Sequence, residues 1–317
     1  MDELPLMTTA TRDILSAAKV SAIVSFGGNS TVQQVRCEHG IFAVKDYSAR
    51  ADGRRRQVRE SEAMDFLYEQ PGVSVPRHIG VSPDGLKAVH SWISGYHPTL
   101  NLETSAKMSE LLDNLHKLSR GGGSGRLRPA TDAIIRVQDV SEQIYNRVGL
   151  IDVKCYSVAA SLMSRVIQAT HIFANFELNF SGPVRTLSPS DFGTHNLLQS
   201  ETGGSLTLID LEFFGWDDAH KLVVDSILHP QARWSMQTQV AFLSDCIDIY
   251  GLCRIRMNRL ARLLGLKWVL IILGRLTRSI PSPDSDALVS RASDMLDWVL
   301  ASPNPLGEVF PRLRESN

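Results

Sequence analysis

Alternating apolar and polar positions dominate the first hundred residues of the chain and predict a sheet with one helix inserted. β-Branched and aromatic residues gather in short runs separated by turn residues, with one helical pattern in between. The predicted order is strand, strand, strand, helix, strand, strand. We expect the strands within residues 22–37 and at 41–47, 78–81 and 86–92, and the helix at 53–69.

From about residue 104 onward the apolar period changes to that of helices. Five apolar side chains of the first helical segment share one face: Met108, Leu111, Leu112, Leu115 and Leu118. Another helix is expected around residues 158–166, and more helices follow a short β-like segment at 196–210. The pattern predicts an α+β fold with a small β-rich N-terminal lobe, 1–95, and a larger, mainly helical C-terminal lobe, 96–317.

The composition fits a globular protein and excludes several classes. The chain has 317 residues, 43% of them hydrophobic, and its 33 Lys and Arg against 34 Asp and Glu give a net charge of −1. This balance argues against a basic nucleic-acid binder. The four cysteines are scattered without a CxxC pair, which is typical of reduced thiols. Because the sequence has neither a signal peptide nor a long apolar run, we expect a cytoplasmic protein that does not bind a membrane.

The β-like segment is expected to bring polar side chains together. Gly203 and Gly204 form a turn signal between two short apolar runs, so a hairpin is predicted. In a hairpin centred near Gly203, Asn196 and Asp210 face each other at the open end. Asp191 lies on the incoming loop, five residues before Asn196. Two carboxylates and one amide oxygen are therefore expected to converge.

Oxygen ligands of this kind suit Mg²⁺, which usually takes one or two carboxylates and completes its shell with water and phosphate. Asp191, held off the metal, is the candidate for a base that orients a hydroxyl nucleophile and accepts its proton. The alternative is structural: Asp191 caps a turn, Asn196 begins a strand and Asp210 ends one. The joint spacing, Asp-x4-Asn followed 14 residues later by Asp, favours the functional interpretation.

The N-terminal half supplies residues that suit a nucleotide. Gly27, Gly28 and Ser30 lie between two strand runs, where glycines let backbone N–H groups approach phosphate oxygens, although an ordinary hairpin turn is the alternative. Lys45 lies in an apolar strand, and a half-buried lysine needs an anionic partner. Glu60 shares a helical face with apolar residues, so it can point inward and pair with Lys45. The alternative is that both are solvated surface charges.

Taken together, these segments resemble the aminoglycoside phosphotransferase and choline kinase family, which has the bilobal protein-kinase-like fold. The resemblance covers roughly residues 20–230 and rests on the order and spacing of several short strings. The strings are GGNSTVQQV (27–35), FAVK (42–45), RESEAMDFL (59–67), VPRHIG (75–80), SWISG (91–95), SELLDNLHKL (109–118), SDFGTHN (190–196) and LIDLEFFGWDD (208–218).

The resemblance implies an ATP-dependent phosphotransferase that uses Mg²⁺ and acts on a hydroxyl group of a small molecule such as a sugar, a polyol or an amino alcohol. Asp191 would be the catalytic base, and Asn196 and Asp210 would hold Mg²⁺. Lys45 would contact the α- and β-phosphates and be oriented by Glu60. The other implied nucleotide contacts are Gly27, Gly28 and Ser30 over the phosphates and the backbone from Ser91 to Ile93 at the adenine.

The sequence departs from the family pattern before the catalytic Asp. Members usually have His-Gly there, whereas this chain has Pro189 and Ser190. A catalytically silent, nucleotide-binding protein is therefore the alternative from a different class. Two residues after Asp210 stands Glu212 rather than the Gly of protein kinases. This Asp-x-Glu form is common among small-molecule kinases of the family and favours a small-molecule acceptor.

The acceptor is expected to bind in the C-terminal lobe near Asp191. Asp217, Asp218 and Asp225 offer the acidity that a cationic aminoglycoside needs, so an antibiotic kinase stays an alternative. Residues 251–280 carry six arginines and Lys267 but no Asp or Glu. They favour a neutral or anionic acceptor if they line the pocket, and otherwise form a solvated helix face. We expect no nucleic-acid partner, and a monomer or a homodimer.

Overall fold

The computed structural model describes residues 9–16, 20–24, 30–136, 138–151, 157–174, 182–201, 203–276, 283–301 and 306. These residues fold into two compact units. Unit 1 draws on Met1–Thr99, Arg120–Arg128 and Thr194–Gly215, and unit 2 on Leu100–Ser119, Pro129–Gly193 and Trp216–Asn317. The lobe boundary expected between residues 95 and 96 stays a prediction.

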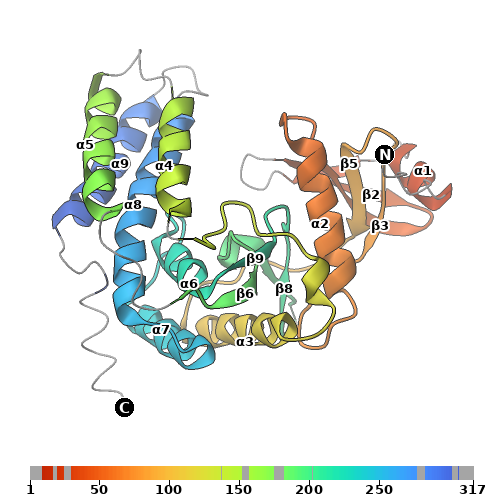
Figure 1. Ribbon diagram of the computed structural model, residues 1–317. Coiled ribbons are helices and arrows are strands. Elements are labelled where there is room, and N and C mark those ends of the chain that lie inside the picture. The colour runs from red at the N-terminus through yellow and green to blue at the C-terminus, as the bar shows by residue number, and fades with distance from the viewer. Residues whose placement is uncertain are drawn as a thin grey trace. The chain divides into compact units, whose positions relative to one another are not determined.

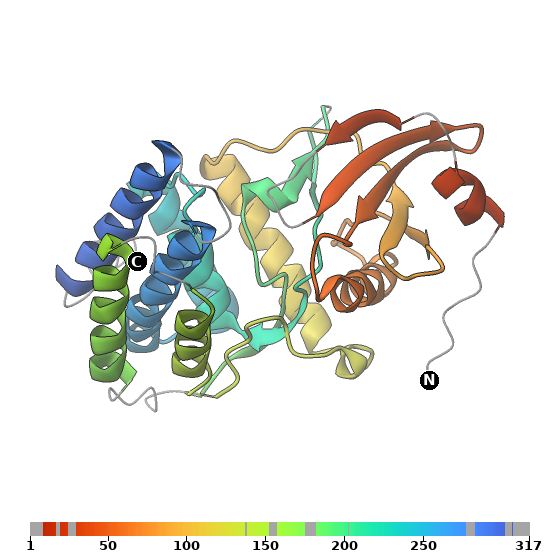
Figure 2. The same ribbon diagram turned by 90° about the horizontal axis from the view of Figure 1, so that it is seen from above.

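Unit 1 is built on a five-stranded antiparallel sheet with the strand order β1-β2-β3-β5-β4 (Figures 1 and 2). The sequence predicts all five strands and the helix between β3 and β4 in the observed order. It does not predict α1 (Thr9–Ser16). The remaining bounds are β1 Val20–Val24, β2 Thr31–Cys37, β3 Gly40–Asp46, α2 Gly53–Leu67, β4 His78–Val81 and β5 Lys87–Ser91.

The two faces of this sheet have different contents, because side chains alternate along each strand. On one face, Val44 and Val89 are buried with Ile14 of α1 in a hydrophobic cluster. The other face carries Lys45, which is paired with Ala88 in the β3–β5 register. Helix α2 packs on β4 and β5. The sheet therefore holds an apolar core on one side and presents a lysine on the other.

A short hairpin from the second half of the chain completes unit 1. It consists of β7 (Leu197–Gln199) and β8 (Leu206–Leu208), preceded by the 3₁₀ helix η2 (Thr194–Asn196). Tyr96 and Gln199 exchange two backbone hydrogen bonds of 3.0 and 2.9 Å, which tie the hairpin to the segment after β5. Gly95 permits this approach, since a Cβ atom there would lie 2.5 Å from the carbonyl oxygen of Gln199.

Unit 2 is mainly helical, as the sequence predicts. Helix α8 contacts α4, α5, α6 and α9, and Figure 1 shows α4, α5, α8 and α9 running side by side. A two-stranded sheet of β6 (Arg185–Ser188) and β9 (Gly215–Asp218), which the sequence does not predict, packs beside α3 and α6 through β6. The helices are α3 Leu102–Ser119, α4 Asp139–Leu150, α5 Ser157–Ala174, α6 Ala219–Leu228, α7 Met236–Tyr250, α8 Arg254–Leu276 and α9 Pro283–Ala301. Among the described helices, none combines the length and apolar character needed to cross a membrane.

Candidate active site

Lys45 lies at the centre of a buried group of charges in unit 1. Its Nζ donates a hydrogen bond of 2.6 Å to Oε2 of Glu60 and another of 2.6 Å to Oδ1 of Asp210. The hydroxyl of Tyr47 donates to the same Glu60 oxygen at 2.6 Å. Lys45 is 5% exposed and Glu60 is 1% exposed. The structure thus pairs Lys45 with Glu60 in the interior and excludes the alternative of two solvated surface charges.

Opposing effects set the ionisation of this group. Burial alone would lower the pKa of Lys45, but the carboxylates of Asp210, Glu60 and Glu212 outweigh it and hold the pKa well above its usual value. Burial raises the pKa of Glu60, an effect that Lys45 opposes and Asp210 reinforces. Three carboxylates therefore lie around this ammonium group, and Arg56 offsets the charge of one of them, Glu212.

Glu212 is a site residue that the sequence marks as a family feature but assigns no role. Its side chain is fully buried, with Oε2 at 3.4 Å from Nζ of Lys45. Arg56 donates a hydrogen bond of 2.7 Å to Oε1 of Glu212, and a second of 3.0 Å to Asp52. Burial raises the pKa of Glu212, and the negative charge of Asp210 adds to this. The only signal in the sequence is a second carboxylate two residues after Asp210.

The β7–β8 hairpin carries Asn196 and Asp210, but not in the predicted register. The strands pair Leu197 with Leu208, and the backbone N–H of Ile209 donates to the carbonyl oxygen of Asn196 at 3.0 Å. Asn196 therefore lies opposite Ile209. The prediction that Asn196 faces Asp210 is wrong by one residue.

The length of the connection explains this shift. Gln199 pairs with Leu206, so six residues connect the strands and the hairpin is centred between residues 202 and 203 rather than on Gly203. Within the connection, the N–H of Gly203 donates to the carbonyl oxygen of Ser200 at 3.0 Å. Gly203 and Gly204 both have positive φ, 78° and 105°. Asp210 itself has φ 58°, an uncommon conformation for a non-glycine residue, and such strained positions cluster at functional sites.

A cavity of about 270 Å³ in unit 1 gathers the predicted nucleotide and metal residues. Most of its lining is apolar, as is usual for small-molecule sites. The predicted residues that line it are Ser30, Lys45, Glu60, Ser91, Ile93, Asn196 and Asp210. Gly27 and Gly28 lie outside the described residues. One cavity is thus lined by every described residue that the sequence predicts to bind the nucleotide or the metal.

The backbone N–H groups of residues 91–93 differ in whether another backbone group already accepts their hydrogen bond. The N–H of Ser91 donates to the carbonyl oxygen of Arg77 at 2.9 Å, and that of Trp92 to Ile41 at 3.4 Å. Both groups are therefore used within unit 1. The N–H of Ile93, which also lines the cavity, has no backbone acceptor in the described part of the chain. Of the three, Ile93 is best placed to bind a base edge.

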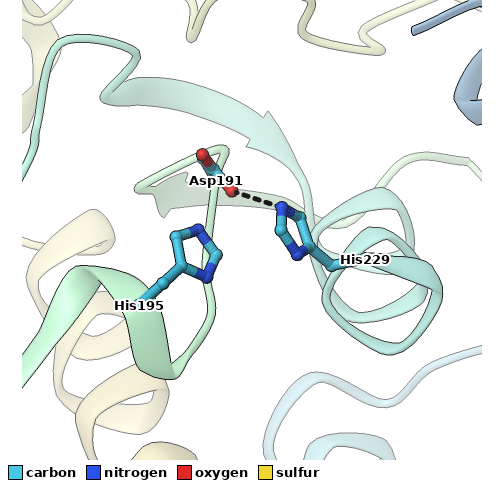
Figure 3. A group of neighbouring side chains, drawn as sticks. All are labelled: Asp191, His195 and His229. Atoms are coloured by element: carbon cyan, nitrogen blue, oxygen red, sulfur yellow. Dashed lines mark ion pairs between the residues drawn. The ribbon is translucent and has the colours of Figure 1, made fainter. Parts of the chain in front are cut away.

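Asp191 belongs to unit 2, on the loop that follows β6. Its Oδ1 lies 3.5 Å from Nε2 of His229, the residue directly after α6, and its side chain is 32% exposed (Figure 3). The ring of His229 packs edge-on against Trp268 with centroids 4.9 Å apart. Trp268 in turn donates to Asp225 at 2.8 Å. His229 is a neighbour that the sequence does not predict, because it follows a different helix and carries no motif.

The donor set in the cavity suits a hard divalent cation. Asn196 and Asp210 offer an amide and a carboxylate oxygen, the ligand types that Mg²⁺ prefers. The Asp210 side chain is 26% exposed, so it remains accessible. Oε2 of Glu212 is buried and accepts no hydrogen bond from any described residue. The cation beside this oxygen is Nζ of Lys45, at 3.4 Å.

Several solved structures share this architecture. The ethanolamine kinase Pv091845 of Plasmodium vivax has a TM-score of 0.63 at 12% identity, covering 90% of this chain and 85% of that one. The choline kinase LicA of Streptococcus pneumoniae has a TM-score of 0.60 at 17% identity, covering 90% and 97%. The amicoumacin kinase hAmiN, in complex with AMP-PNP, Ca²⁺ and Ami, has a TM-score of 0.61 at 13% identity, covering 91% and 92%.

The chain therefore has the protein-kinase-like α+β fold of the choline and ethanolamine kinases, a fold that aminoglycoside phosphotransferases also share with it. The resemblance noted in the sequence is confirmed at the level of the fold. No protein-family model matches the chain, and no curated protein matches it in sequence.

Proposed function

We propose that this protein is a small-molecule kinase, which transfers the γ-phosphoryl group of ATP to a hydroxyl group of its acceptor. The observation that carries the proposal is Lys45, buried at the wall of a cavity and bonded to both Glu60 and Asp210. A buried, permanently charged lysine beside a cavity suits phosphate oxygens. The structural neighbours are small-molecule kinases, which supports the same class.

The nucleotide would occupy the cavity of unit 1. Lys45 would bind the α- and β-phosphates, held in place by Glu60, and Ser30 together with Gly27 and Gly28 would cover the phosphates. The N–H of Ile93 would bind the adenine. Pro76 and Leu198 line the same cavity and supply apolar surface for the base.

Asn196 and Asp210 would hold Mg²⁺, which neutralises phosphate charge and aligns the β- and γ-phosphates when bound. The acceptor oxygen attacks the γ-phosphorus, the bond from γ-phosphorus to the bridging oxygen breaks, and ADP leaves. Asp191 would orient the acceptor hydroxyl and take its proton. Lys45 stabilises the nucleotide phosphates throughout, because its pKa stays high.

The charges near Asp191 in unit 2 favour a neutral polyhydroxy acceptor over a polycation. Asp217 and Asp225 already face Lys221, at 2.9 and 3.5 Å. Asp132 is paired with Arg147 and with Lys267 at 3.2 Å. Carboxylates that are already neutralised attract a cationic aminoglycoside weakly.

An anionic acceptor gains no support either. Arg256 is 2% exposed and donates two hydrogen bonds to Asp218, at 2.9 and 2.7 Å. The alternative of a solvated helix face does not hold for Arg256, because this guanidinium is buried against the carboxylate of Asp218. Lys267 is buried as well, and its Nζ donates to Gln143 at 3.0 Å. A sugar or another polyol therefore fits the site best.

The second candidate is a silent nucleotide-binding protein, which Pro189 in place of the usual His favours. The cytoplasm suits either function, since ATP is abundant there and none of the described cysteines, Cys37, Cys246 and Cys253, forms a disulfide. The test is a transfer screen with Mg²⁺ and ATP against sugars, polyols, amino alcohols and aminoglycosides, read by mass spectrometry. Phosphorylation of a polyol supports the kinase, whereas nucleotide binding without any transfer supports the silent protein.

A further inference from the structure

Ser190, the residue before Asp191, has a backbone conformation that its sequence does not favour. Its φ is 68°, in the left-handed region where non-glycine residues are uncommon. Such a conformation persists only where surrounding contacts fix it. The side chain and backbone of Ser190 should therefore be held from several sides.

The contacts of Ser190 meet this requirement. Its N–H donates to Oγ of Ser188 at 2.9 Å, and its own Oγ donates to the carbonyl oxygen of Thr131 at 2.9 Å. Nζ of Lys221 donates to the same Oγ at 3.0 Å. The loop that carries Asp191 is thus hydrogen-bonded to Ser188 at the end of β6, to Thr131, and to Lys221 of α6.

Lys221 is an unusual residue for its position. It is 1% exposed and lies in the first turn of α6, where a positive charge opposes the helix dipole. Burial alone would lower its pKa, but Asp217 and Asp225 outweigh this and raise it, so the ammonium stays charged. These two ion pairs offset the unfavourable helix dipole, and a hydrogen bond from Nζ to Ser190 gives Lys221 a contact outside its own helix.

Nζ of Lys221 has three oxygen neighbours: it donates a hydrogen bond of 3.0 Å to Oγ of Ser190 and forms ion pairs with Oδ2 of Asp217 at 2.9 Å and Oδ2 of Asp225 at 3.5 Å. Asp217 is itself fixed, since its Oδ1 accepts the backbone N–H groups of Ile134 and Asp218 at 2.9 Å each. The lysine is therefore a rigid link between the base of α6 and the loop.

We infer that Lys221 is a positioning residue for the proposed catalytic base: by holding Ser190 in its left-handed conformation, it fixes the direction in which Asp191 leaves the loop. The inference rests on the proposed role of Asp191. A displacement of about 1 Å of a reacting group can lower a rate by roughly 100-fold. Loss of the link should therefore reduce kcat, while ATP, bound by residues of unit 1, keeps its KM.

The test compares two buried lysines of unit 2. Lys221→Met removes the link to Ser190, whereas Lys267→Met is the matched control, because Lys267 also faces an aspartate, Asp132, but contacts no residue of the loop in the described structure. We expect kcat to fall about 100-fold in Lys221→Met and less than about 3-fold in Lys267→Met, with the KM for ATP unchanged in both. Equal kcat in the two variants overturns the inference.

A second variant covers the case in which Lys221→Met does not fold. Ser190→Ala removes the hydroxyl that Lys221 holds but keeps the Cβ atom that disfavours positive φ, so we expect kcat to fall at least about 10-fold. Ser190→Gly is the control, because glycine adopts positive φ without strain and should retain more of the wild-type kcat than Ser190→Ala. Wild-type kcat in Ser190→Ala, or equal losses in the two variants, overturns the inference.

Hydrogen exchange separates this inference from the proposed function. If the wild-type protein transfers no phosphate, the proposed function fails, but the link can still be measured. The amide of Ser190 should exchange at least about 10-fold faster in Lys221→Met than in Lys267→Met, because its conformation is no longer held. Equal exchange in both variants rejects Lys221 as the residue that fixes the loop.

Discussion

Lys45 and Asp210 are joined by a hydrogen bond of 2.6 Å although 165 residues separate them along the chain. One belongs to β3 and the other follows β8, so the bond forms only when the late hairpin packs on the early sheet. The proposed phosphate-binding lysine and the proposed metal ligand therefore position each other. Folding of unit 1 therefore brings these two residues of the candidate site together.

Replacing Lys45 should affect stability and nucleotide binding together. In Lys45→Met, Glu60 and Glu212 stay buried without their ammonium partner, so we expect a loss of about 3–5 kcal/mol in the free energy of unfolding. The affinity for ATP should fall at least about 10-fold. Urea denaturation and isothermal titration calorimetry measure the two effects.

The matched control is Lys87→Met in the neighbouring strand. Lys87 faces Asp46 at 3.5 Å with its side chain 47% exposed, so its loss should cost less than about 1 kcal/mol and leave ATP affinity unchanged. If Lys45→Met behaves like Lys87→Met in both measurements, the nucleotide-site assignment is wrong.

His90 should make the protein sensitive to acid. It is 3% exposed and lines the cavity, and neither ring nitrogen has a hydrogen-bond partner among the described residues. Burial lowers the pKa of His90 well below its usual value, with His78 and Lys45 adding to this. The folded state therefore stays neutral at His90, while the unfolded state takes up a proton as pH falls below about 6.5. Stability from this residue is intact above pH 6.5 and is lost as the pH decreases further.

His90→Leu should remove this contribution. We expect the variant to be about 1 kcal/mol more stable at pH 8, because two unsatisfied nitrogens are gone. Between pH 6.5 and pH 5 the free energy of unfolding should fall less steeply in the variant than in the wild type. The difference between the two slopes should be at most about 1.4 kcal/mol per pH unit, the effect of one proton. Urea midpoints at several pH values give both numbers, and the exposed His39→Leu is the control. An unchanged pH dependence in His90→Leu would show that His90 is not held neutral.

Gly95 should be intolerant of a side chain. A Cβ atom at this position would lie 2.5 Å from the carbonyl oxygen of Gln199, so Gly95→Ala must displace either the hairpin or the segment after β5. We expect a loss of about 1–3 kcal/mol in the free energy of unfolding. We also expect weaker ATP binding, since the hairpin (Leu198) and the segment after β5 (Gly95) both line the cavity. Gly125→Ala, where no atom lies within 4 Å of the added carbon, should change neither. Thermal unfolding with and without ATP distinguishes them, and equal behaviour would refute the close contact.

Much of unit 1 could be predicted from its sequence because local patterns determine it. The alternation of apolar and polar residues predicts the strands around Lys45, and the turn residues between them predict where each strand ends. The helical spacing of Glu60 with apolar residues correctly predicts that its side chain points into the interior. Each of these patterns extends over only a few residues, so it can be recognised without knowledge of the tertiary structure.

The remaining features depend on contacts that local patterns do not encode. The register of Asn196 shifts by one because Gln199 pairs with Leu206, and a sequence shows the presence of Gly203 and Gly204 but not which residues on either side of them pair. The left-handed φ of Ser190 is imposed by its contacts, including Lys221. His229 reaches Asp191 only through the packing of unit 2.

Asp191→Asn tests the central claim most directly, because it removes the proposed base and retains the size of the side chain. Wild-type protein and variant should be compared in one assay of Mg²⁺–ATP binding and phosphate transfer, using the best acceptor from the screen. We predict equal ATP affinity, with transfer reduced by about 100-fold to 10,000-fold in the variant. Transfer at the wild-type rate by Asp191→Asn would contradict the account.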